Sequence, residues 1–162
     1  MKQIPLTRGH VALVSDCDYA YLMRWVWHSS GKRASPYAAS SAGKLYMHHV
    51  VARRKGLKGQ RIDHANQNTL DNQRRNLRAA TRPQNAWNSR RPVNNTSGIK
   101  NVSFDKQTGK FAVRVKRHGK QIWLGRHPTR KAAEKCVRNF VAKHDGAFAA
   151  VAEPFNSRGD LP

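Results

Sequence analysis

Cysteine, acidic residues and long apolar runs are all scarce in this sequence. Cys17 and Cys136 lie far apart, and neither belongs to a C-x-x-C pair, which argues against a disulfide framework and against a structural zinc site with four ligands. No apolar segment approaches the ~18 residues of a membrane span, and the first residues lack the apolar core of a signal peptide. We therefore expect a protein of a reducing cytoplasm with no membrane partner.

The shortage of acidic residues leaves a large positive charge. Nine Asp and Glu stand against 31 Lys and Arg, a formal net charge of +22. Residues 1–88 contain 15 basic and 4 acidic residues, and residues 89–162 contain 16 and 5, so each part has a net charge of +11. A polyanion would relieve this self-repulsion, which makes DNA or RNA the expected partner class. A basic protein with no specific partner, or one associated with the ribosome, is the alternative.

Residues 1–43 predict a β-rich segment with one short helix. Residues 4–14 alternate as two strands around a turn at Gly9, and Asp16 is a candidate cap for a helix over residues 18–27. The expected apolar face of that helix consists of Tyr21, Leu22, Trp25 and Val26. A hairpin follows, formed by "PYAAS", a turn at Gly43 and "KLYMHHVVA", although the end of this last stretch can instead begin a helix.

Residues 61–88, "RIDHANQNTLDNQRRNLRAATRPQNAWN", predict a hairpin followed by a helix. The strands "QRIDHA" and "NLRAAT" enclose a polar loop. Thr81 is the expected N-cap, with Pro83 in the first turn and Gln84 at the capping-box position. This arrangement can bring Asp63 and His64 close to Asn85, which lies 21 residues further along the chain.

These residue types suit phosphodiester hydrolysis. Asp63 offers an anionic oxygen and Asn85 an amide oxygen, which together can hold a cation such as Mg²⁺ with water and phosphate oxygens. His64, with an ordinary pKa near 6.5, can take a proton from the attacking water. Asn76 is expected to brace the loop by hydrogen bonds to backbone groups. The alternative is a polar Asx-rich loop that contains a structural histidine.

The stretch from Tyr46 to Asn88 resembles the HNH endonucleases of phage and intron-encoded homing enzymes. That branch shows "HR", "DH", "NNxxxNLR" and "T…QN", and this sequence has His48-His49, Asp63-His64, "DNQRRNLR" and Thr81 with "QN" at the same spacings. The resemblance over residues 44–88 implies a ββα-metal nuclease core.

Site roles follow from this resemblance. It implies that His64 is the general base, that Asp63 and Asn85 bind the divalent ion, and that Asn76 is the structural asparagine. His48 would contact a phosphate or brace the hairpin, with the second role favoured. Two positions depart from the family pattern: His49 replaces the arginine of "HR" and is expected to face away from His48, and Asn66-Gln67 replaces an acidic-glycine pair, which changes the loop turn.

After a polar linker over residues 89–96, residues 97–150 predict three strands and a helix. The strands are "IKNVSF", "KFAVRVKRHG" and "KQIWLGRH", and the helix runs from an N-cap at Thr129 to a stop at Gly146. Its apolar face is expected to contain Ala132, Ala133, Cys136, Val137, Phe140 and Val141. Residues 151–162 are expected to be a tail.

Alternation in these strands separates an apolar face from a cationic one. Phe111, Val113, Val115, Ile122 and Leu124 share the first face, and Arg114, Lys116, Gln121 and Trp123 share the second. Trp123 on a cationic face suggests contact with sugar or base, although packing in the core is the usual fate of a tryptophan. A twisted sheet of this kind can enter a major groove.

Residues 97–150 resemble the plant ethylene-response-factor domain, also called the APETALA class, through "GIKNVSF", "GKFAVRV", "IWLGRHPT", the alanine-rich helix and "HDGAFA". The resemblance implies DNA contacts by Lys100, Ser103, Arg114, Lys116, Gln121 and Trp123. Asn101, Ser103 and Asp105 depart from the plant pattern, so the target sequence of the plant proteins does not transfer.

The sequence as a whole predicts an α+β protein in which an HNH nuclease module precedes a sheet-and-helix module that binds double-stranded DNA. The expected activity is a site-directed endonuclease that uses one Mg²⁺ or Mn²⁺ ion and acts as a monomer or weak dimer. The alternatives are a DNA-binding regulator whose nuclease fold is inactive and an RNA-binding or ribosome-associated protein.

Overall fold

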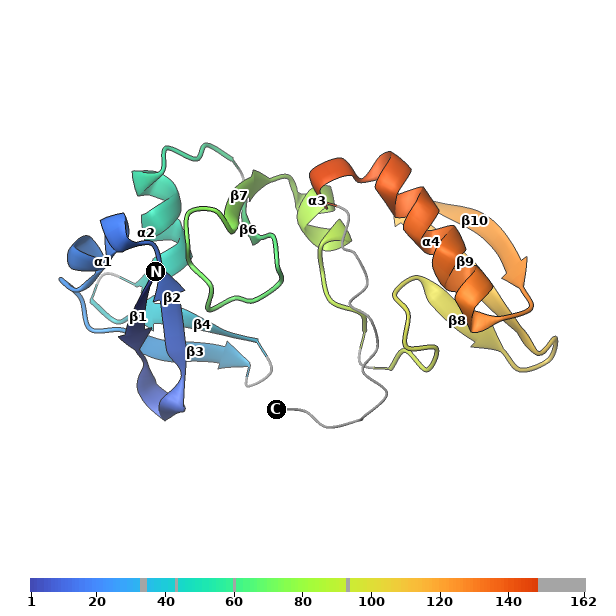
Figure 1. Ribbon diagram of the computed structural model, residues 1–162, viewed down its shortest axis with the longest axis horizontal. Helices are drawn as coiled ribbons and strands as arrows, with labels where there is room; N and C mark the ends of the chain where they lie inside the picture. Colours follow the sequence, from blue (N-terminus) through green and yellow to red (C-terminus); the bar gives the residue numbers. More distant parts are fainter. Residues whose placement is uncertain (33–34, 43, 60, 93, 149–162) are drawn as a thin grey trace. The chain divides into compact units, whose positions relative to one another are not determined.

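The chain divides into two compact units, Met1–Asn85 and Ala86–Pro162. The computed structural model describes residues 1–32, 35–42, 44–59, 61–92 and 94–148. The division falls inside α3, Arg82–Trp87, so this short helix begins in the first unit and ends in the second. Both units combine small antiparallel sheets with helices, which confirms the predicted α+β class (Figure 1).

The first unit is built from three small sheets and three helices. Its elements are β1 Lys2–Pro5, β2 Val11–Val14, α1 Asp16–Leu22, β3 His28–Lys32, β4 Ser35–Ser40, β5 Leu45–Tyr46, α2 Met47–Arg54, β6 Arg61–His64 and β7 Leu77–Ala80, followed by the start of α3. The sheets are β1-β2, β3-β4-β5 and β6-β7. A 3-10 turn, Thr7–Gly9, joins the first two strands around the predicted turn position.

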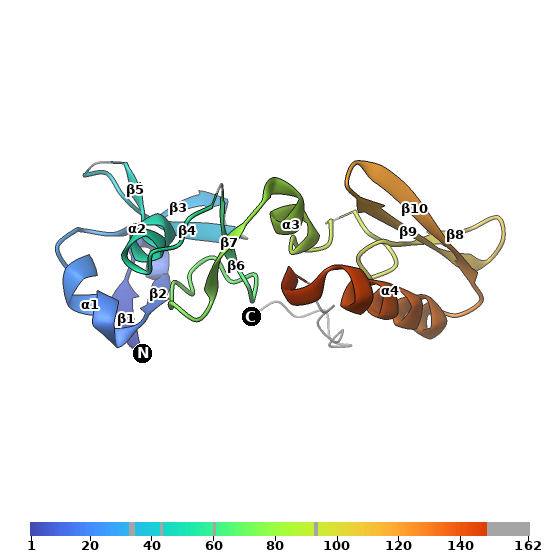
Figure 2. The same ribbon diagram turned by 90° about the horizontal axis from the view of Figure 1, so that it is seen from above.

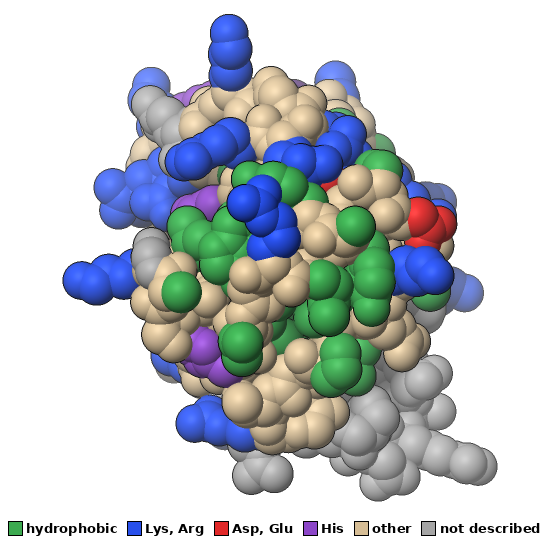
Figure 3. All heavy atoms as spheres, turned by 90° about the vertical axis from the view of Figure 1, so that its left-hand side faces the viewer, with side chains coloured by type: hydrophobic (Ala, Val, Ile, Leu, Met, Phe, Trp, Pro, Cys, Tyr) green, Lys and Arg blue, Asp and Glu red, His purple; other side chains and the backbone are tan. Residues whose placement is uncertain are grey.

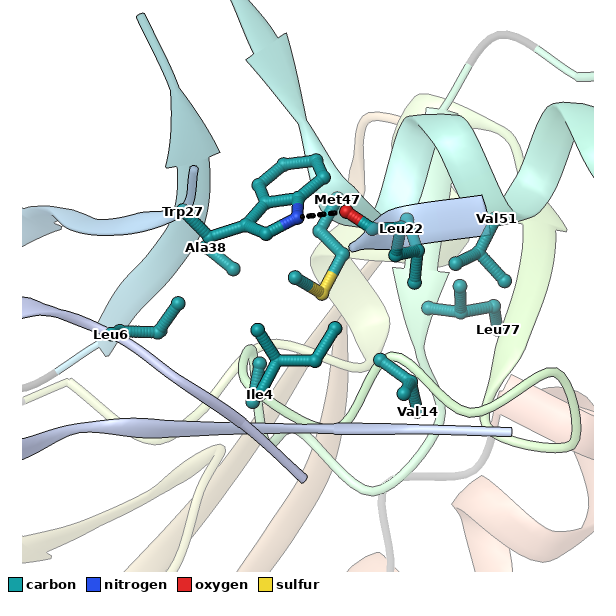
Figure 4. Packing of buried hydrophobic residues seen from close by; sticks show 10 residues of the cluster. Ile4, Leu6, Val14, Leu22, Trp27, Ala38, Met47, Val51 and Leu77 are labelled. Atoms are coloured by element: carbon teal, nitrogen blue, oxygen red, sulfur yellow. Dashed lines mark hydrogen bonds between the residues drawn. The ribbon is translucent and has the colours of Figure 1, made fainter. Parts of the chain in front are cut away.

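One apolar core holds these elements together. Leu22, Met47, Val51 and Leu77 are fully buried, and they come from α1, α2 and β7. Met47 and Val51 are four residues apart, so they lie on one face of α2. Figure 4 shows Met47 pointing toward Ile4 and Trp27, whose indole nitrogen donates a hydrogen bond of 2.8 Å to the Leu22 carbonyl oxygen.

Helix α1 differs from its prediction at both ends. Ser15, not Asp16, is the N-cap residue, and Asp16 is the first helical residue. The helix ends at Leu22, so Val26 does not continue an apolar face and is 86% exposed. Trp27 turns into the core instead, where its indole is a second donor to the Leu22 carbonyl, which also accepts the Trp25 N–H at 3.2 Å.

Most of the segment after β4, for which the sequence allowed either a strand or the start of a helix, is helical. Only Leu45 and Tyr46 form a strand, β5, and the helix α2 begins at Met47. His48 and His49 are therefore helical residues and not the end of a strand. The predicted turn at Gly43 lies outside the described residues.

Asp18 joins three distant segments of the first unit. Its carboxylate is fully buried and accepts hydrogen bonds from Arg54 at 2.8 Å and from Arg74 at 2.7 and 2.8 Å. The bond from Arg74, and after it the one from Arg54, holds the pKa of Asp18 below its ordinary value. A buried charge needs such partners, so this ion cluster fixes α1, α2 and the loop before β7 against one another.

The second unit is a three-stranded antiparallel sheet with one long helix. Its strands are β8 Val102–Asp105, β9 Lys110–Arg117 and β10 Lys120–His127, in the order β10-β9-β8, and α4 Arg130–His144 is followed by a 3-10 turn, Gly146–Phe148. Figures 1 and 2 both show α4 lying along this sheet. Its core consists of Ile99, Val102, Val113, Ala133, Val137 and Val141.

Local signals in the second unit match the prediction closely. Thr129 is the N-cap of α4, and its hydroxyl accepts a hydrogen bond of 3.2 Å from the Ala132 N–H. The first strand starts at Val102, later than predicted, because residues 99–101 form a turn in which Asn101 has a φ of 67°. The side-chain amide of Asn95 donates to the carbonyls of Ile99 and Val102 at 3.1 and 2.9 Å, so the end of the predicted linker packs on this unit.

None of the helices in the described ranges combines the length and apolarity that crossing a bilayer requires. The predicted tail, residues 151–162, lies outside the described residues.

Candidate active site

The predicted hairpin is formed by β6 and β7 and ends in the predicted helix. Asp63 pairs across the ladder with Arg78, and His64 pairs with Leu77. At the start of α3, the Thr81 N–H donates to the Gln84 side-chain oxygen at 2.8 Å, and the Gln84 N–H donates to the Thr81 hydroxyl at 3.4 Å. This reciprocal pair is the predicted capping box, and it places Asn85 in the first helical turn.

Asp63 and His64 are the last two residues of β6, and both are buried. Successive side chains of a strand point to opposite faces, and the partners of these two residues differ accordingly. The Asp63 carboxylate lies against the guanidinium of Arg78, with nitrogen–oxygen distances of 2.7 and 2.8 Å. Arg78 therefore fixes the position of the Asp63 side chain at the end of the hairpin.

The His64 ring is oriented by Asn72. The imidazole Nε2 lies 3.3 Å from the Asn72 side-chain oxygen, and the amide nitrogen of Asn72 donates to the Leu70 carbonyl at 3.2 Å. The amide oxygen therefore faces His64, and in the tautomer of the neutral ring that donates to this oxygen, Nε2 carries the proton. Nδ1 then has the lone pair that can accept a proton.

Burial keeps His64 neutral. Loss of solvation lowers the pKa of its imidazole, and the hydrogen bond that the ring donates to Asn72 and the charges of Asp63 and Asp71 oppose that shift. A neutral imidazole at physiological pH is the form that a general base needs.

Two more rings lie against His64. The centroid of the His48 ring lies 5.3 Å from that of His64, and Tyr37 lies 5.4 Å from His48 and 6.2 Å from His64. His48 is buried, and desolvation, followed by the charges of His49 and His64, lowers its pKa to about 3. A neutral, packed His48 fits the predicted brace better than a phosphate contact.

His49 does not face away from His48 as alternation in a strand would require. The two ring centroids are 4.2 Å apart in an edge-to-face arrangement. Consecutive residues of a helix are about 100° apart around its axis, so the helical conformation of α2 explains the difference. His49 is exposed, whereas His48 is buried.

The loop between β6 and β7 is held by asparagine side chains, as its composition predicts. The Asn76 amide donates to the Asp71 carbonyl at 2.7 Å, and its oxygen accepts from the Asn66 N–H at 3.0 Å. Asn66 in turn donates to the Asp71 carboxylate at 2.7 Å. The hydrogen bonds of Asn76 to the backbone are those that were expected of it.

The turn after His64 is tight although Asn66-Gln67 replaces the acidic-glycine pair of the family pattern. Gln67 has a φ of 62°, in the region that favours glycine, and its N–H donates to the His64 carbonyl at 2.9 Å. Glutamine thus adopts the conformation for which glycine is the usual choice, at the cost of backbone strain.

The donor set of the predicted metal site consists of one carboxylate and one amide. Within the described ranges, no group of three or more His, Cys, Asp or Glu side chains can hold a metal ion, which leaves the pair Asp63 and Asn85 untested. A carboxylate has about four lone-pair directions, so an aspartate that pairs with a guanidinium can also bind a cation. A carboxylate and an amide oxygen are both ligand types that Mg²⁺ accepts when water completes its coordination shell.

The predicted DNA-contacting residues of the sheet share one exposed face. Arg114 pairs across the ladder with Trp123, and Lys116 pairs with Gln121. All four are exposed, as is Ser103 on β8. Trp123 is 47% exposed, with the guanidinium of Arg114 4.9 Å and that of Arg126 5.4 Å from the ring centroid. Trp123 is thus a surface residue and not part of the core.

Lys100 lies apart from this face. Its ammonium donates to the carbonyl oxygens of Ala86, Trp87 and Ser89 at 3.3, 2.6 and 2.5 Å, around the end of α3. Burial lowers the pKa of Lys100 to about 8. This role as a cap for a helix end was not predicted, because it depends on a fold-specific contact between residues 11 to 14 positions apart.

Three residues of the site were also missed by sequence reasoning: Asn72, Arg78 and Tyr37. Asn72 and Arg78 lie in the quoted "DNQRRNLR" stretch, and the cross-strand position of Arg78 could have been inferred from the hairpin register. Tyr37 comes from β4, and no local pattern links it to His64.

Comparison with known proteins gives one partial similarity. The sequence matches no family model and no solved structure. A stretch of 64 residues is 41% identical to part of Protein 3.8 of Escherichia phage T7. This stretch makes up 40% of the present chain and 53% of the phage protein. The chain spans about half the length of the relative that it matches. The name of the relative states no activity.

Proposed function

We propose that this chain is a site-directed DNA endonuclease that hydrolyses a phosphodiester bond with one divalent ion. The main support is His64, a buried neutral imidazole whose Nε2 is held by Asn72 and which directly follows a buried carboxylate, Asp63. A proton acceptor that directly follows an anionic ligand along the strand, in a protein with a net charge of +22, suits attack on a nucleic-acid backbone.

In the proposed mechanism, His64 removes the proton from the attacking water through Nδ1. Asn72 keeps the ring in the tautomer that allows this step, and the packing of His48 and Tyr37 restricts its rotation. Asp63 and Asn85 would hold the cation, which when bound offsets negative charge on the phosphate and leaving oxygen.

The remaining residues position the site. Asn76 holds the loop that contains Asn72, and Arg78 fixes the carboxylate of Asp63 at the end of β6. The exposed sheet face with Arg114, Lys116 and Trp123 would bind duplex DNA and select where the cut occurs. A single active site of this type predicts one nick per chain.

A second function is favoured by one contact. The ion pair between Asp63 and Arg78 competes with a metal for the carboxylate, and a permanent pair would leave a DNA-binding regulator without nuclease activity. Arg78 would then act as a substitute for the cation.

Plasmid nicking in the presence of Mg²⁺ tests the proposal. The wild type is expected to convert supercoiled plasmid to the open circle, and His64→Ala is expected to lose at least ~100-fold in rate, the usual contribution of general base catalysis, while it retains DNA affinity. Asn139→Ala, on an exposed position of α4, is the control. A wild type that binds duplex DNA but cuts with neither Mg²⁺ nor Mn²⁺ would favour the regulator.

A further inference from the structure

A second basic site lies on the first unit, at the other end of β6. A cleft of about 440 Å³ lies between the last turns of α2 and the start of β6, within the ~300–1,000 Å³ range of ligand clefts. Its lining consists of His49, Ala52, Arg53, Gly56, Leu57, Lys58, Gly59, Arg61 and Ile62. Four of these residues are Lys, Arg or His, and none is acidic.

The backbone of the cleft is fixed. After α2, the Gly56 N–H donates to the Arg53 carbonyl at 3.0 Å and the Leu57 N–H donates to the Ala52 carbonyl at 2.9 Å. Gly56 has a φ of 76°, which glycine adopts without strain. At Gly59, a Cβ would lie 2.8 Å from that of Ala79, so the chain passes closely against β7. The basic side chains thus extend from a braced turn.

The basic residues of this region fall into two groups. Arg54 pairs with Asp18, and the Lys55 ammonium donates to the carbonyls of Arg74 and Leu77 at 2.7 and 2.8 Å. In contrast, Arg53, Lys58 and Arg61 are exposed and pair with no carboxylate among the described residues.

The sequence explains this lack of neutralisation, since no Asp or Glu occurs between Asp18 and Asp63. Figure 3 shows a face of the first unit with many Lys and Arg side chains and little acidic surface. The lining of the cleft thus has four basic side chains and no acidic one, so a phosphate would find several donors there.

The length of β6 gives the distance between the cleft and the candidate active site. Arg61 and His64 are the first and last residues of the strand, and a rise of ~3.3 Å per residue separates them by about 10 Å. The two sites are also joined through α2, because His48 contacts His64 and His49 lines the cleft. Phosphates follow one another at ~3.4 Å along the duplex axis and lie further apart in space because the strand winds around that axis, so 10 Å corresponds to at most about three nucleotides.

We propose that this cleft binds a backbone phosphate of duplex DNA, about two or three nucleotides from the bond that is cut. Arg53 and Arg61 would donate paired N–H groups to the phosphate oxygens, with Lys58 and His49 beside them. The inference deepens the proposed function: a second contact on the same strand would align the scissile phosphate with His64.

The test compares two double variants of the full chain. Arg53→Gln with Arg61→Gln alters the cleft, and Arg8→Gln with Lys32→Gln removes the same charge from exposed positions elsewhere in the first unit. The probe is a duplex enriched from a random-sequence pool by binding to the wild type. Methylphosphonates, which are uncharged, replace its phosphates one at a time, and affinity is measured at several salt concentrations.

The cleft variant is expected to bind about 10-fold more weakly or worse, as for lost charged hydrogen bonds, and the control about twofold or less. A methylphosphonate at one position, or at two adjacent positions, should weaken duplex binding by the wild type. The same substitution should leave binding by the cleft variant unaffected, because that variant has already lost the arginines that contact this phosphate. For the cleft variant, the slope of log K against log salt concentration should be shallower than for the wild type by the amount that corresponds to about one phosphate contact.

Equal losses in the two double variants, or no phosphate position whose effect depends on the cleft, would overturn the inference and leave a solvated basic surface. Because the measurement is binding, it separates the two proposals. A wild type that never cuts but shows the interference would refute the nuclease and support the phosphate site. Where cutting does occur, an interfering position more than about five nucleotides from the nick would contradict the distance set by β6.

Discussion

At the scale of single residues, the neutral state of His48 has a measurable consequence for stability. The imidazole lies among the rings of Tyr37, Tyr46 and His49, and its pKa falls to about 3. The same group in the unfolded chain has a pKa near 6.5. Between these two values the unfolded state binds a proton that the folded state does not, so stability decreases as the pH falls.

We predict that the free energy of unfolding falls between pH 6.5 and pH 4 by up to ~1.4 kcal/mol per pH unit from His48 alone. Denaturant unfolding at several pH values measures this slope. In His48→Phe, which keeps an aromatic ring and cannot titrate, the slope should be shallower. Identical slopes in the two proteins would show that His48 takes up its proton in the folded state. His49 and His64, whose pKa values are also lowered, add to the slope in both proteins.

Gln67 is a second residue with a testable role. A non-glycine residue with positive φ costs ~1–2 kcal/mol, partly offset by the extra entropy that glycine loses on folding. Gln67→Gly should therefore be more stable than Gln67→Ala by up to ~1 kcal/mol, because both variants lose the glutamine side chain and only alanine keeps the backbone strain. A glycine variant that is less stable than wild type would mean that the Gln67 side chain contributes more than its backbone conformation costs.

At the scale of elements, the end of α3 depends on a residue from the next segment. Lys100 satisfies carbonyls that a helix end leaves without intrahelical partners. Lys100→Met keeps the length of the side chain and removes the charge. We expect it to lower the free energy of unfolding of the second unit by about 1–3 kcal/mol, as for lost charged hydrogen bonds.

Lys116→Met is the matched control for Lys100, because Lys116 is exposed on the sheet face. This control should lose DNA affinity with little loss of stability, whereas Lys100→Met should show the opposite pattern. If Lys100→Met reduces affinity and leaves unfolding unchanged, the lysine contacts DNA, as the family resemblance implies, and the cap is secondary.

The elements that could be predicted from sequence are those with local signals. Thr81 with Gln84, and Thr129, mark the starts of α3 and α4, and alternation separates Val113 and Val115 from Arg114. The segment 44–52 has no such signal, since "KLYMHHVVA" fits a strand or a helix, and packing of Met47 and Val51 in the core decides for the helix.

Contacts between distant segments could not be predicted. Asp18 meets Arg74 across 56 positions, and Tyr37 meets His64 through the arrangement of separate sheets. Asp63, His64 and Asn76 were found from residue types and spacing, while the partners that orient them, Arg78 and Asn72, depend on the register of β6 with β7 and on the path of the loop.

At the scale of the whole molecule, the net charge and the exposed sheet face suggest separate contributions to DNA binding. In the proposed function, the charge would attract any duplex, and Trp123, with Arg114 and Arg126 beside it, would contact sugar or base. We predict that Trp123→Ala reduces the ratio of specific to nonspecific affinity by about 10-fold, as for loss of one stacked base, with a smaller change in nonspecific affinity. Equal losses on both duplexes would make Trp123 a general contact without a role in selectivity.

The central claim is that Asp63 and Asn85 hold one cation beside His64, and binding of Mn²⁺ to the DNA-bound chain, followed by electron paramagnetic resonance, tests it most directly. One Mn²⁺ ion should bind to the wild type and to His64→Ala, and Asp63→Asn and Asn85→Ala should each reduce that affinity by ~10-fold or more, as for a lost charged contact. If Asp63→Asn and Asn85→Ala bind Mn²⁺ as the wild type does, the two residues do not share an ion, and the proposed metal site is wrong.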